Sequence, residues 1–124
     1  MESHPHVRVL RGKKIILGVT GGIAAYKAVT VASRLAQAGA LVDVLMTEAA
    51  QKFVAPLTFS ALTGRSVATD LWSLGNGQIM HVALAREVDL FLVAPATANT
   101  IAKLALGLAD DPLSATALAS RGPL

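Results

Sequence analysis

The sequence predicts a parallel α/β sheet with right-handed crossovers in a single domain. Short apolar runs rich in β-branched residues stop at glycines or polar turns, as strands buried on both faces do. Segments with a helical period follow these runs, so strand and helix signals alternate along the chain. The 124 residues leave room for one hydrophobic core and exclude a second packed domain.

The first three elements form a βαβ unit. Residues 15–20 are an apolar run that stops at Gly21–Gly22 and should form the first strand. From Ile23 onward, polar residues recur every three or four positions among Ala, Val and Leu, which indicates a helix with one narrow polar stripe. Gly39 is the expected stop of this helix, and residues 41–46 supply the second strand.

The remaining elements are shorter. We expect, in order, a helix that starts at Thr47–Glu48 and runs to about residue 54, a helix from Pro56 to Leu62, a short strand over residues 66–70, a loop over residues 71–78, helical turns over residues 81–87 and a buried strand over residues 89–94. Residues 98–108 have a helical period but one charge, Lys103, which predicts a helix buried on every side. Asp111–Pro112 should begin a last helix, and residues 121–124 resemble the start of a further strand.

Composition limits the classes of function. The chain is 53% hydrophobic and 15% charged, so it is not disordered, and its charge-free stretches are shorter than the about 20 apolar residues of a membrane span. It has no cysteine, which excludes disulfides, thiolate metal sites and a thiol nucleophile on this chain, and no metal site is predicted. No basic face for nucleic acid is evident. Residues 1–12 lack the apolar core of a signal peptide, so we expect a flexible arm on a cytoplasmic protein.

The first candidate ligand site is the turn at residues 18–25, Gly-Val-Thr-Gly-Gly-Ile-Ala-Ala, between the first strand and the first helix. A helix start offers unpaired N–H groups and partial positive charge, and glycine lets a phosphate approach the backbone closely. The turn is neither a P-loop nor a strict Gly-x-Gly-x-x-Gly. The alternative is a tight turn that needs glycine only for its dihedral angles.

The end of the second strand bears on which nucleotide would bind. A dinucleotide-binding domain places Asp or Glu there, about 20 residues after the glycines. Here Thr47 comes first, and its hydroxyl suits either a phosphate contact in a mononucleotide site or an N-cap. Glu48 follows and keeps an NAD-binding Rossmann fragment as an alternative.

The third candidate is the bend at residues 94–100, where Thr97, Asn99 and Thr100 lie between a strand and a helix. If all strands are parallel, this bend shares an edge of the sheet with the two earlier turns. Thr97 or Asn99 could instead only cap the helix. Asp110 and Asp111 also resemble a helix cap more than a catalytic pair, because adjacent residues point in different directions.

His81 is the one histidine beyond the leader. Its unperturbed pKa suits proton transfer near neutrality, although a lone histidine is also compatible with a structural or exposed position.

Several motifs, taken in order, resemble the flavin-containing cysteine decarboxylases, and most closely their bacterial branch that acts on phosphopantothenoylcysteine. They are Gly-Val-Thr-Gly-Gly-Ile-Ala-Ala-Tyr-Lys at residues 18–27, Met-Thr-Glu-Ala-Ala at 46–50, Leu-Thr-Phe-Ser-Ala-Leu-Thr-Gly at 57–64, His81, Ala-Pro-Ala-Thr-Ala-Asn-Thr at 94–100 and Gly-Leu-Ala-Asp-Asp at 107–111. The resemblance implies a three-layer, Rossmann-like sandwich of the flavodoxin type, FMN as cofactor, and homotrimers with each flavin at a subunit boundary.

The resemblance also implies roles for individual residues. Gly21, Gly22, Ile23 and Thr47 would hold the FMN phosphate, Thr97, Ala98, Asn99 and Thr100 would line the flavin ring and ribityl chain, and His81 would be the active-site base. Phe53 is a candidate for an aromatic contact with the flavin, or an ordinary core or rim residue.

The implied reaction is FMN-dependent decarboxylation of 4'-phosphopantothenoylcysteine to 4'-phosphopantetheine in coenzyme A biosynthesis. The family's downstream Pro-x-Met-Asn-x-x-Met-Trp segment, its flap cysteine and the fused ligase half are absent from this sequence. We therefore expect residues 13–124 to form an FMN-binding domain that is incomplete at its C-terminus. A flavin-binding module without turnover is the alternative that this departure favours.

Overall fold

The computed structural model describes residues 9–69 and 86–124, which form a four-stranded sheet with the strand order β3-β2-β1-β4. The strands are β1 (Lys14–Val19), β2 (Leu41–Met46), β3 (Val67–Ala68) and β4 (Leu90–Val93). The helices are α1 (Ala25–Gln37), α2 (Pro56–Thr63), α4 (Ala98–Leu106) and α5 (Pro112–Ala119), with a 3₁₀ helix at Ala50–Lys52. All neighbouring strands are parallel, which confirms the predicted sheet.

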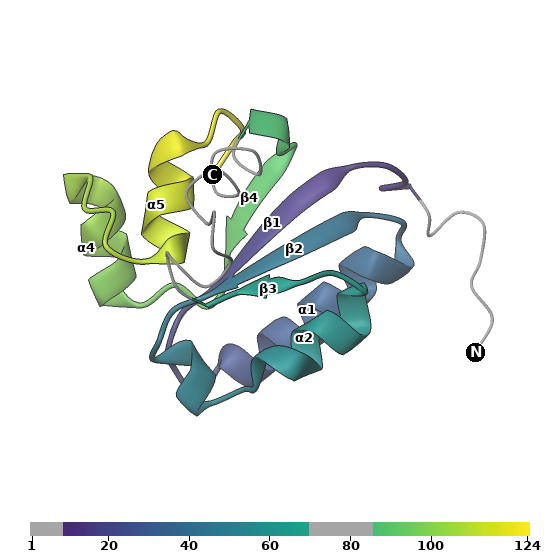
Figure 1. Cartoon of the computed structure of the whole chain (residues 1–124), viewed down its shortest axis with the longest axis horizontal. Coiled ribbons are helices and arrows are strands. Elements are labelled where there is room, and N and C mark those ends of the chain that lie inside the picture. The colour runs from purple at the N-terminus through teal and green to yellow at the C-terminus, as the bar shows by residue number, and fades with distance from the viewer. Residues whose placement is uncertain (1–8, 70–85) are drawn as a thin grey trace.

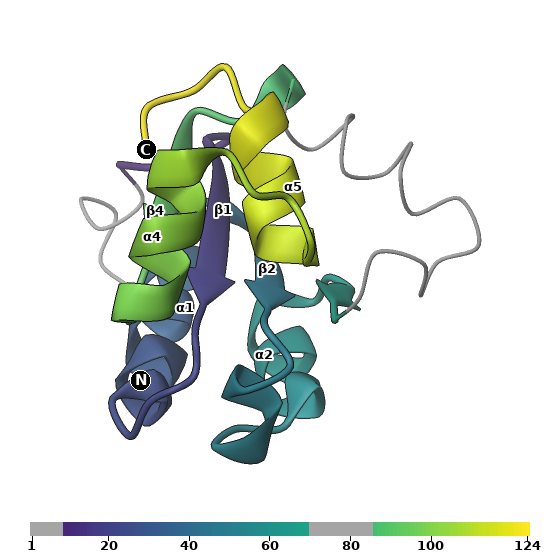
Figure 2. The same ribbon diagram turned by 90° about the vertical axis from the view of Figure 1, so that its left-hand side faces the viewer.

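The molecule has three layers, with α1 and α2 on one face of the sheet and α4 and α5 on the other (Figures 1 and 2). Side chains of β1 alternate between the two faces. Leu17 and Val19 join the core beneath α1 and α2, whereas Ile16 packs in the second core with Leu113 of α5. Because both faces of β1 are covered, its sequence is a continuous apolar run.

Helix α1 lies close to the sheet because its buried residues, Ala25, Ala28 and Ala32, are all small. The helix begins two residues later than the predicted Ile23, since the chain first completes the glycine turn. Gly39 ends this segment as predicted, with a φ of 96° that favours glycine. A side chain at Gly39 would also meet the backbone of Arg11, whose neighbour Leu10 donates its N–H to the Ala38 carbonyl at 3.0 Å.

The caps predicted for the later helices are confirmed. Pro56 begins α2, and Gly64 ends it in the left-handed conformation. Asp111 caps α5 through a capping box. Its side chain accepts from the Ser114 N–H, and the Ser114 hydroxyl accepts from the Asp111 N–H.

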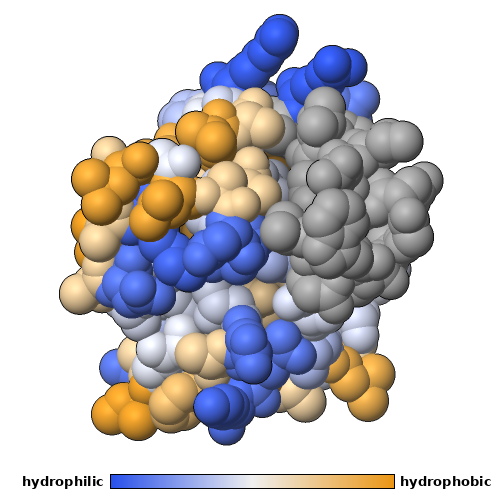
Figure 3. All heavy atoms as spheres, turned by 60° about the vertical axis from the view of Figure 1, so that its left-hand side comes forward, coloured by the Kyte–Doolittle hydropathy of each residue, from blue (hydrophilic) through white to orange (hydrophobic). Residues whose placement is uncertain are grey.

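The prediction that α4 is buried on every side is wrong for the single chain. Among its residues, Thr100 alone is buried, while Ile101 and Leu106 are 53% and 75% exposed. Figure 3 shows hydrophobic residues gathered in the upper left of that view, on the side of the molecule that carries α4. A helical period without charge shows that a helix is apolar, but it does not show whether its own chain covers it.

Strand β4 is less buried than its sequence predicts. Phe91 is 1% exposed, but Leu90 is 38% exposed, because β4 is the edge strand of the described sheet. The Phe91 N–H donates to the Pro123 carbonyl at 2.8 Å, so the segment predicted as the start of a further strand lies beside β4.

Within residues 9–69 and 86–124, every helix is too short or too polar to cross a bilayer. The same residues contain no cluster of three His, Cys, Asp or Glu side chains that could hold a metal ion. The loop predicted over residues 71–78 and most of the helical turns predicted over residues 81–87 lie outside the described residues.

Candidate functional site

The three predicted turns meet at one edge of the sheet. The strands that precede them end level with one another, since Val19 of β1 pairs with Met46 of β2 and Gly18 of β1 pairs with Val93 of β4. The backbone continues this register beyond the strands, because the Thr47 N–H donates to the Val19 carbonyl at 3.1 Å. The predicted convergence is therefore confirmed.

The strand order places a topological switch point at this edge. The chain runs from β1 to β2 and β3 on one side, and then returns to β4 on the other side of β1. Open parallel sheets bind ligands outside the carboxyl ends of the strands at such a point. The turn after β1 and the bend after β4 flank it, and the loop after β2 lies beside it.

Gly21 and Gly22 have different surroundings. A Cβ at Gly21 would lie 2.4 Å from the Ala49 Cβ, so this glycine lets the turn after β1 pack on the loop after β2. A Cβ at Gly22 would meet no atom of the described residues within 4 Å. Within the described part of the chain, the N–H groups of Gly22 and Ile23 have no hydrogen-bond acceptor. Open space beside two available donors is an arrangement that suits an anion.

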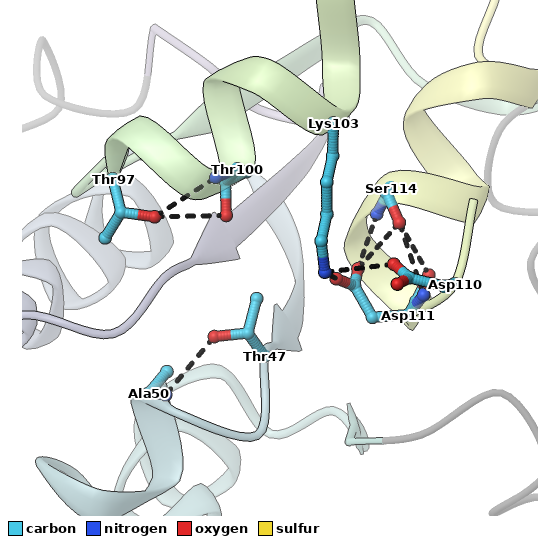
Figure 4. A network of polar contacts seen from close by, with 8 residues as sticks. All are labelled: Thr47, Ala50, Thr97, Thr100, Lys103, Asp110, Asp111 and Ser114. Carbon is cyan, nitrogen blue, oxygen red and sulfur yellow. Dashed lines mark hydrogen bonds and ion pairs between the residues drawn. The ribbon is translucent and has the colours of Figure 1, made fainter. Parts of the chain in front are cut away.

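Thr47 follows β2 and precedes the 3₁₀ helix, whose N-cap is Ala49, so the predicted N-cap role of Thr47 is wrong. Its hydroxyl accepts from the Ala50 N–H at 3.2 Å. A hydroxyl that accepts in this way keeps its own hydrogen to donate. The side chain is 9% exposed and lies at the same edge as the start of α4 (Figure 4), whereas the neighbouring Glu48 is exposed.

The bend after β4 leads into the N-terminus of α4. Thr97 is the N-cap, and its hydroxyl accepts from the Thr100 N–H at 3.3 Å (Figure 4). Thr100 is buried, while Ala98 and Asn99 are exposed in the first turn. Capping therefore accounts for Thr97 and Thr100, whereas the Asn99 side chain has no hydrogen bond to another residue within 9–69 and 86–124.

Neither α1 nor α4 has an acidic residue in its first turn. The partial positive charge at each helix start is therefore not offset by a side chain of that turn. Since both helices begin at the switch point, the local electrostatics favour a ligand that carries negative charge.

Thr20 is a residue of this edge that the sequence analysis missed. It follows β1, is fully buried, and donates its hydroxyl to the Pro95 carbonyl at 2.5 Å. The same oxygen accepts from the Thr97 N–H at 3.0 Å. A hydroxyl at the end of an otherwise apolar strand was the available signal, because a buried hydroxyl needs hydrogen-bond partners.

Lys103 extends from α4 to the start of α5 (Figure 4). Its Nζ lies 3.0 Å from Asp110 Oδ1 and 3.3 Å from Asp111 Oδ2. The hydrogen bond that Lys103 donates to the Asp110 carboxylate is the main cause that raises the pKa of Lys103 above its ordinary value. Both aspartates thus contact Lys103, and Asp111 also caps α5, which confirms the helix cap predicted at this pair.

Two predicted site residues stand apart from this group. Phe53 ends the 3₁₀ helix after β2 and is 49% exposed, so it is a rim residue and not a core residue. His81 lies outside the described residues.

A parallel α/β sheet with helices on both faces and helix N-termini at its switch point defines the flavodoxin-like, Rossmann-type class of nucleotide-binding folds. The model of the family Flavoprotein matches residues 3–123, and the chain belongs to this family.

Similar proteins agree with this assignment. The chain is 50% identical over 117 residues to the coenzyme A biosynthesis bifunctional protein CoaBC of Bacillus subtilis, covering 94% of the chain and 29% of that protein. It is 48% identical over 112 residues to CoaBC of Mycobacterium tuberculosis, covering 90% of the chain and 27% of that protein. The chain therefore spans less than a third of the length of these relatives.

Solved structures show the same fold. The FMN-dependent cysteine decarboxylase SpaF superposes with a TM-score of 0.83 at 34% identity, covering 93% of this chain and 67% of that one. TvaF, from thioviridamide biosynthesis, gives a TM-score of 0.83 at 29% identity, with 91% and 74% covered. A PPC decarboxylase mutant complexed with pantothenoylaminoethenethiol gives 0.73 at 27% identity, with 90% and 62% covered.

Proposed function

We propose that this chain binds FMN and forms the flavin-binding part of an enzyme that decarboxylates 4'-phosphopantothenoylcysteine to 4'-phosphopantetheine in coenzyme A biosynthesis. The observation that carries the proposal is the set of available donors and open space at the switch point, in a chain 50% identical to a CoaBC protein. The similarity to FMN-dependent cysteine decarboxylases supports FMN over NAD.

The phosphate of FMN would bind to the turn after β1. The N–H groups of Gly21, Gly22 and Ile23 face no acceptor within residues 9–69 and 86–124, and the Thr47 hydroxyl has a hydrogen to donate. Together these groups offer neutral donors in a partly positive environment, which fits a dianionic phosphate.

The flavin ring and ribityl chain would lie along the first turn of α4. Asn99 is exposed there, and its amide can both donate and accept hydrogen bonds. Ala98 has a small side chain that lets a flat ring approach the helix, while Thr97 and Thr100 maintain the cap. Phe53 offers an exposed aromatic side chain after β2.

When bound, FMN would supply reversible two-electron oxidation of the substrate cysteine, which lets the neighbouring carboxylate leave as carbon dioxide. The residues of the chain would fix the ring and the substrate in place and accept a proton. We assign the proton acceptor to His81, the role that the resemblance to the flavin-containing cysteine decarboxylases implies for it.

The apolar surface of α4 supports assembly into homotrimers. Ile101 and Leu106 are exposed in the single chain, together with Leu108 just beyond the helix. Burial of these side chains by a second copy would remove apolar surface from water and place α4 at a subunit boundary. A cytoplasmic location belongs to the same proposal.

The absorbance spectrum of the purified chain with added FMN tests cofactor binding, and release of carbon dioxide from phosphopantothenoylcysteine tests turnover. We expect protein-bound oxidised flavin and carbon dioxide. Bound flavin without carbon dioxide would identify a flavin-binding module, and a colourless protein that binds NAD would contradict the proposal.

A further inference from the structure

We propose that Thr20 is a positioning residue for the flavin site: its hydroxyl locks the phosphate turn after β1 to the first turn of α4. This inference rests on the proposed function, since it concerns the same cofactor. It adds a residue that makes no contact with the ligand and acts through the two segments that do.

The hydrogen bonds of Thr20 carry this inference. Its hydroxyl donates to the Pro95 carbonyl at 2.5 Å and accepts from the Thr97 N–H at 3.0 Å. Pro95 lies 75 residues away along the chain, so these bonds join segments that are adjacent only in the folded sheet. Thr97 in turn accepts from the Thr100 N–H, which extends the connection into the first turn of α4.

The position of Thr20 in the chain makes these bonds relevant to a ligand. Thr20 immediately precedes Gly21–Gly22, whose amides would hold the phosphate, and its partner Thr97 immediately precedes Ala98 and Asn99. A cofactor that touches both turns would require a fixed spacing between them. The backbone ladder between β1 and β4 ends at the Ala94 N–H, which donates to the Gly18 carbonyl, so the Thr20 hydroxyl ties the two segments beyond the sheet.

Thr116 provides a matched control. Both threonines are 0% exposed, but the Thr116 hydroxyl on α5 has no hydrogen-bond partner within the described residues. Replacement of either residue by valine preserves the β-branched shape and removes a hydroxyl. In Thr20→Val the change also leaves a part-buried carbonyl and a part-buried N–H without the Thr20 partner, whereas in Thr116→Val no such bond is lost.

The experiment compares wild type, Thr20→Val, Thr20→Ser and Thr116→Val in the full chain. FMN affinity is measured by titration of flavin fluorescence, the bound flavin by its visible spectrum, and the apo chain by circular dichroism. We expect Thr20→Val to raise the FMN Kd about ten-fold and change the flavin spectrum, with native circular dichroism. Thr20→Ser retains the hydroxyl and should restore affinity to within about two-fold of wild type, and Thr116→Val should leave affinity unchanged.

Other results would overturn the inference. Wild-type affinity in Thr20→Val, or equal losses in Thr20→Ser and Thr20→Val, would show that the hydroxyl does not position the site. If Thr20→Val fails to fold, amide hydrogen exchange in the wild-type apo chain tests the bond between Thr20 and Thr97 instead. The Thr97 N–H, which donates to the Thr20 hydroxyl, should exchange more slowly than the Ala98 N–H. Equal rates would exclude this hydrogen bond. A wild-type chain that binds no FMN overturns the proposed function and this inference with it.

Discussion

Gly21 and Gly22 are adjacent in the sequence, yet the fold needs them for different reasons. Gly21 allows two loops to pack, because any side chain there would collide with Ala49, including its backbone carbonyl carbon at 2.9 Å. Gly22 borders open space and contributes an available N–H. The missing side chain of Gly21 therefore allows the two loops to pack, whereas the missing side chain of Gly22 leaves space open at the proposed phosphate site.

This difference predicts that replacement by alanine changes stability at Gly21 but FMN binding at Gly22. Gly21→Ala should lower the free energy of unfolding by about 1–3 kcal/mol, because the added methyl group overpacks a close contact. Gly22→Ala should leave stability within about 0.5 kcal/mol of wild type, as surface substitutions usually do, and weaken FMN binding by narrowing the space for phosphate. Urea unfolding of the apo chain and flavin titration measure the two effects, and a stable Gly21→Ala variant would contradict the packing role.

At this scale the sequence identified the turns that meet at the sheet edge, but not the residue that joins two of them. Thr47 and Thr97 could be selected as candidates from the sequence, because a hydroxyl that follows a strand or precedes a helix suits a helix cap or a ligand contact. The role of Thr20 depends on Pro95, which is 75 residues away, so local pattern could not assign it. For the same reason, the contact that makes Gly21 necessary was not predictable from the turn itself.

Helix α5 shows how two adjacent aspartates divide their roles. Asp111 Oδ1 accepts from the Ser114 N–H at 2.7 Å, while Asp110 is 64% exposed and contacts Lys103. A capping carboxylate satisfies an N–H that the helix leaves open, and its negative charge complements the helix dipole. An exposed ion pair contributes little to stability because water screens it.

We therefore expect Asp111→Ala to destabilise the chain by about 0.5–2 kcal/mol and Asp110→Ala by less than about 1 kcal/mol. Thermal unfolding followed by circular dichroism compares the two variants under identical conditions. Equal decreases in Tm would contradict the assignment of the cap to Asp111.

Element types were predicted well where local chemistry determines them. The apolar runs of β1 and β2, Gly39, Pro56 and Asp111 each specify a strand, a stop or a start through nearby residues. The burial of α4 and β4 was not predicted, because it depends on what lies next to them in space. The sequence shows that Leu106 is apolar, but it does not show whether its own chain or another copy covers the side chain.

For the whole molecule, the exposed apolar side chains of α4 predict self-association. Leu106→Glu would place a charge on this surface and should shift the chain toward monomers in sedimentation velocity. Leu57→Glu is the matched control, since Leu57 is also 75% exposed but lies on α2, on the other face of the sheet. A wild-type chain that sediments as a monomer at low micromolar concentration would contradict the proposed trimer.

The pairing of β1 with β4 has a consequence for how the protein matures. This pair joins early and late parts of the chain, and closing so long a loop costs conformational entropy before any contact compensates for it. The proposed flavin site takes residues from the turn after β1 and from the bend after β4, so it cannot form until that loop has closed. During refolding, capture of flavin should therefore lag behind the recovery of helical circular dichroism, and acquisition of the yellow colour would mark the last step of assembly.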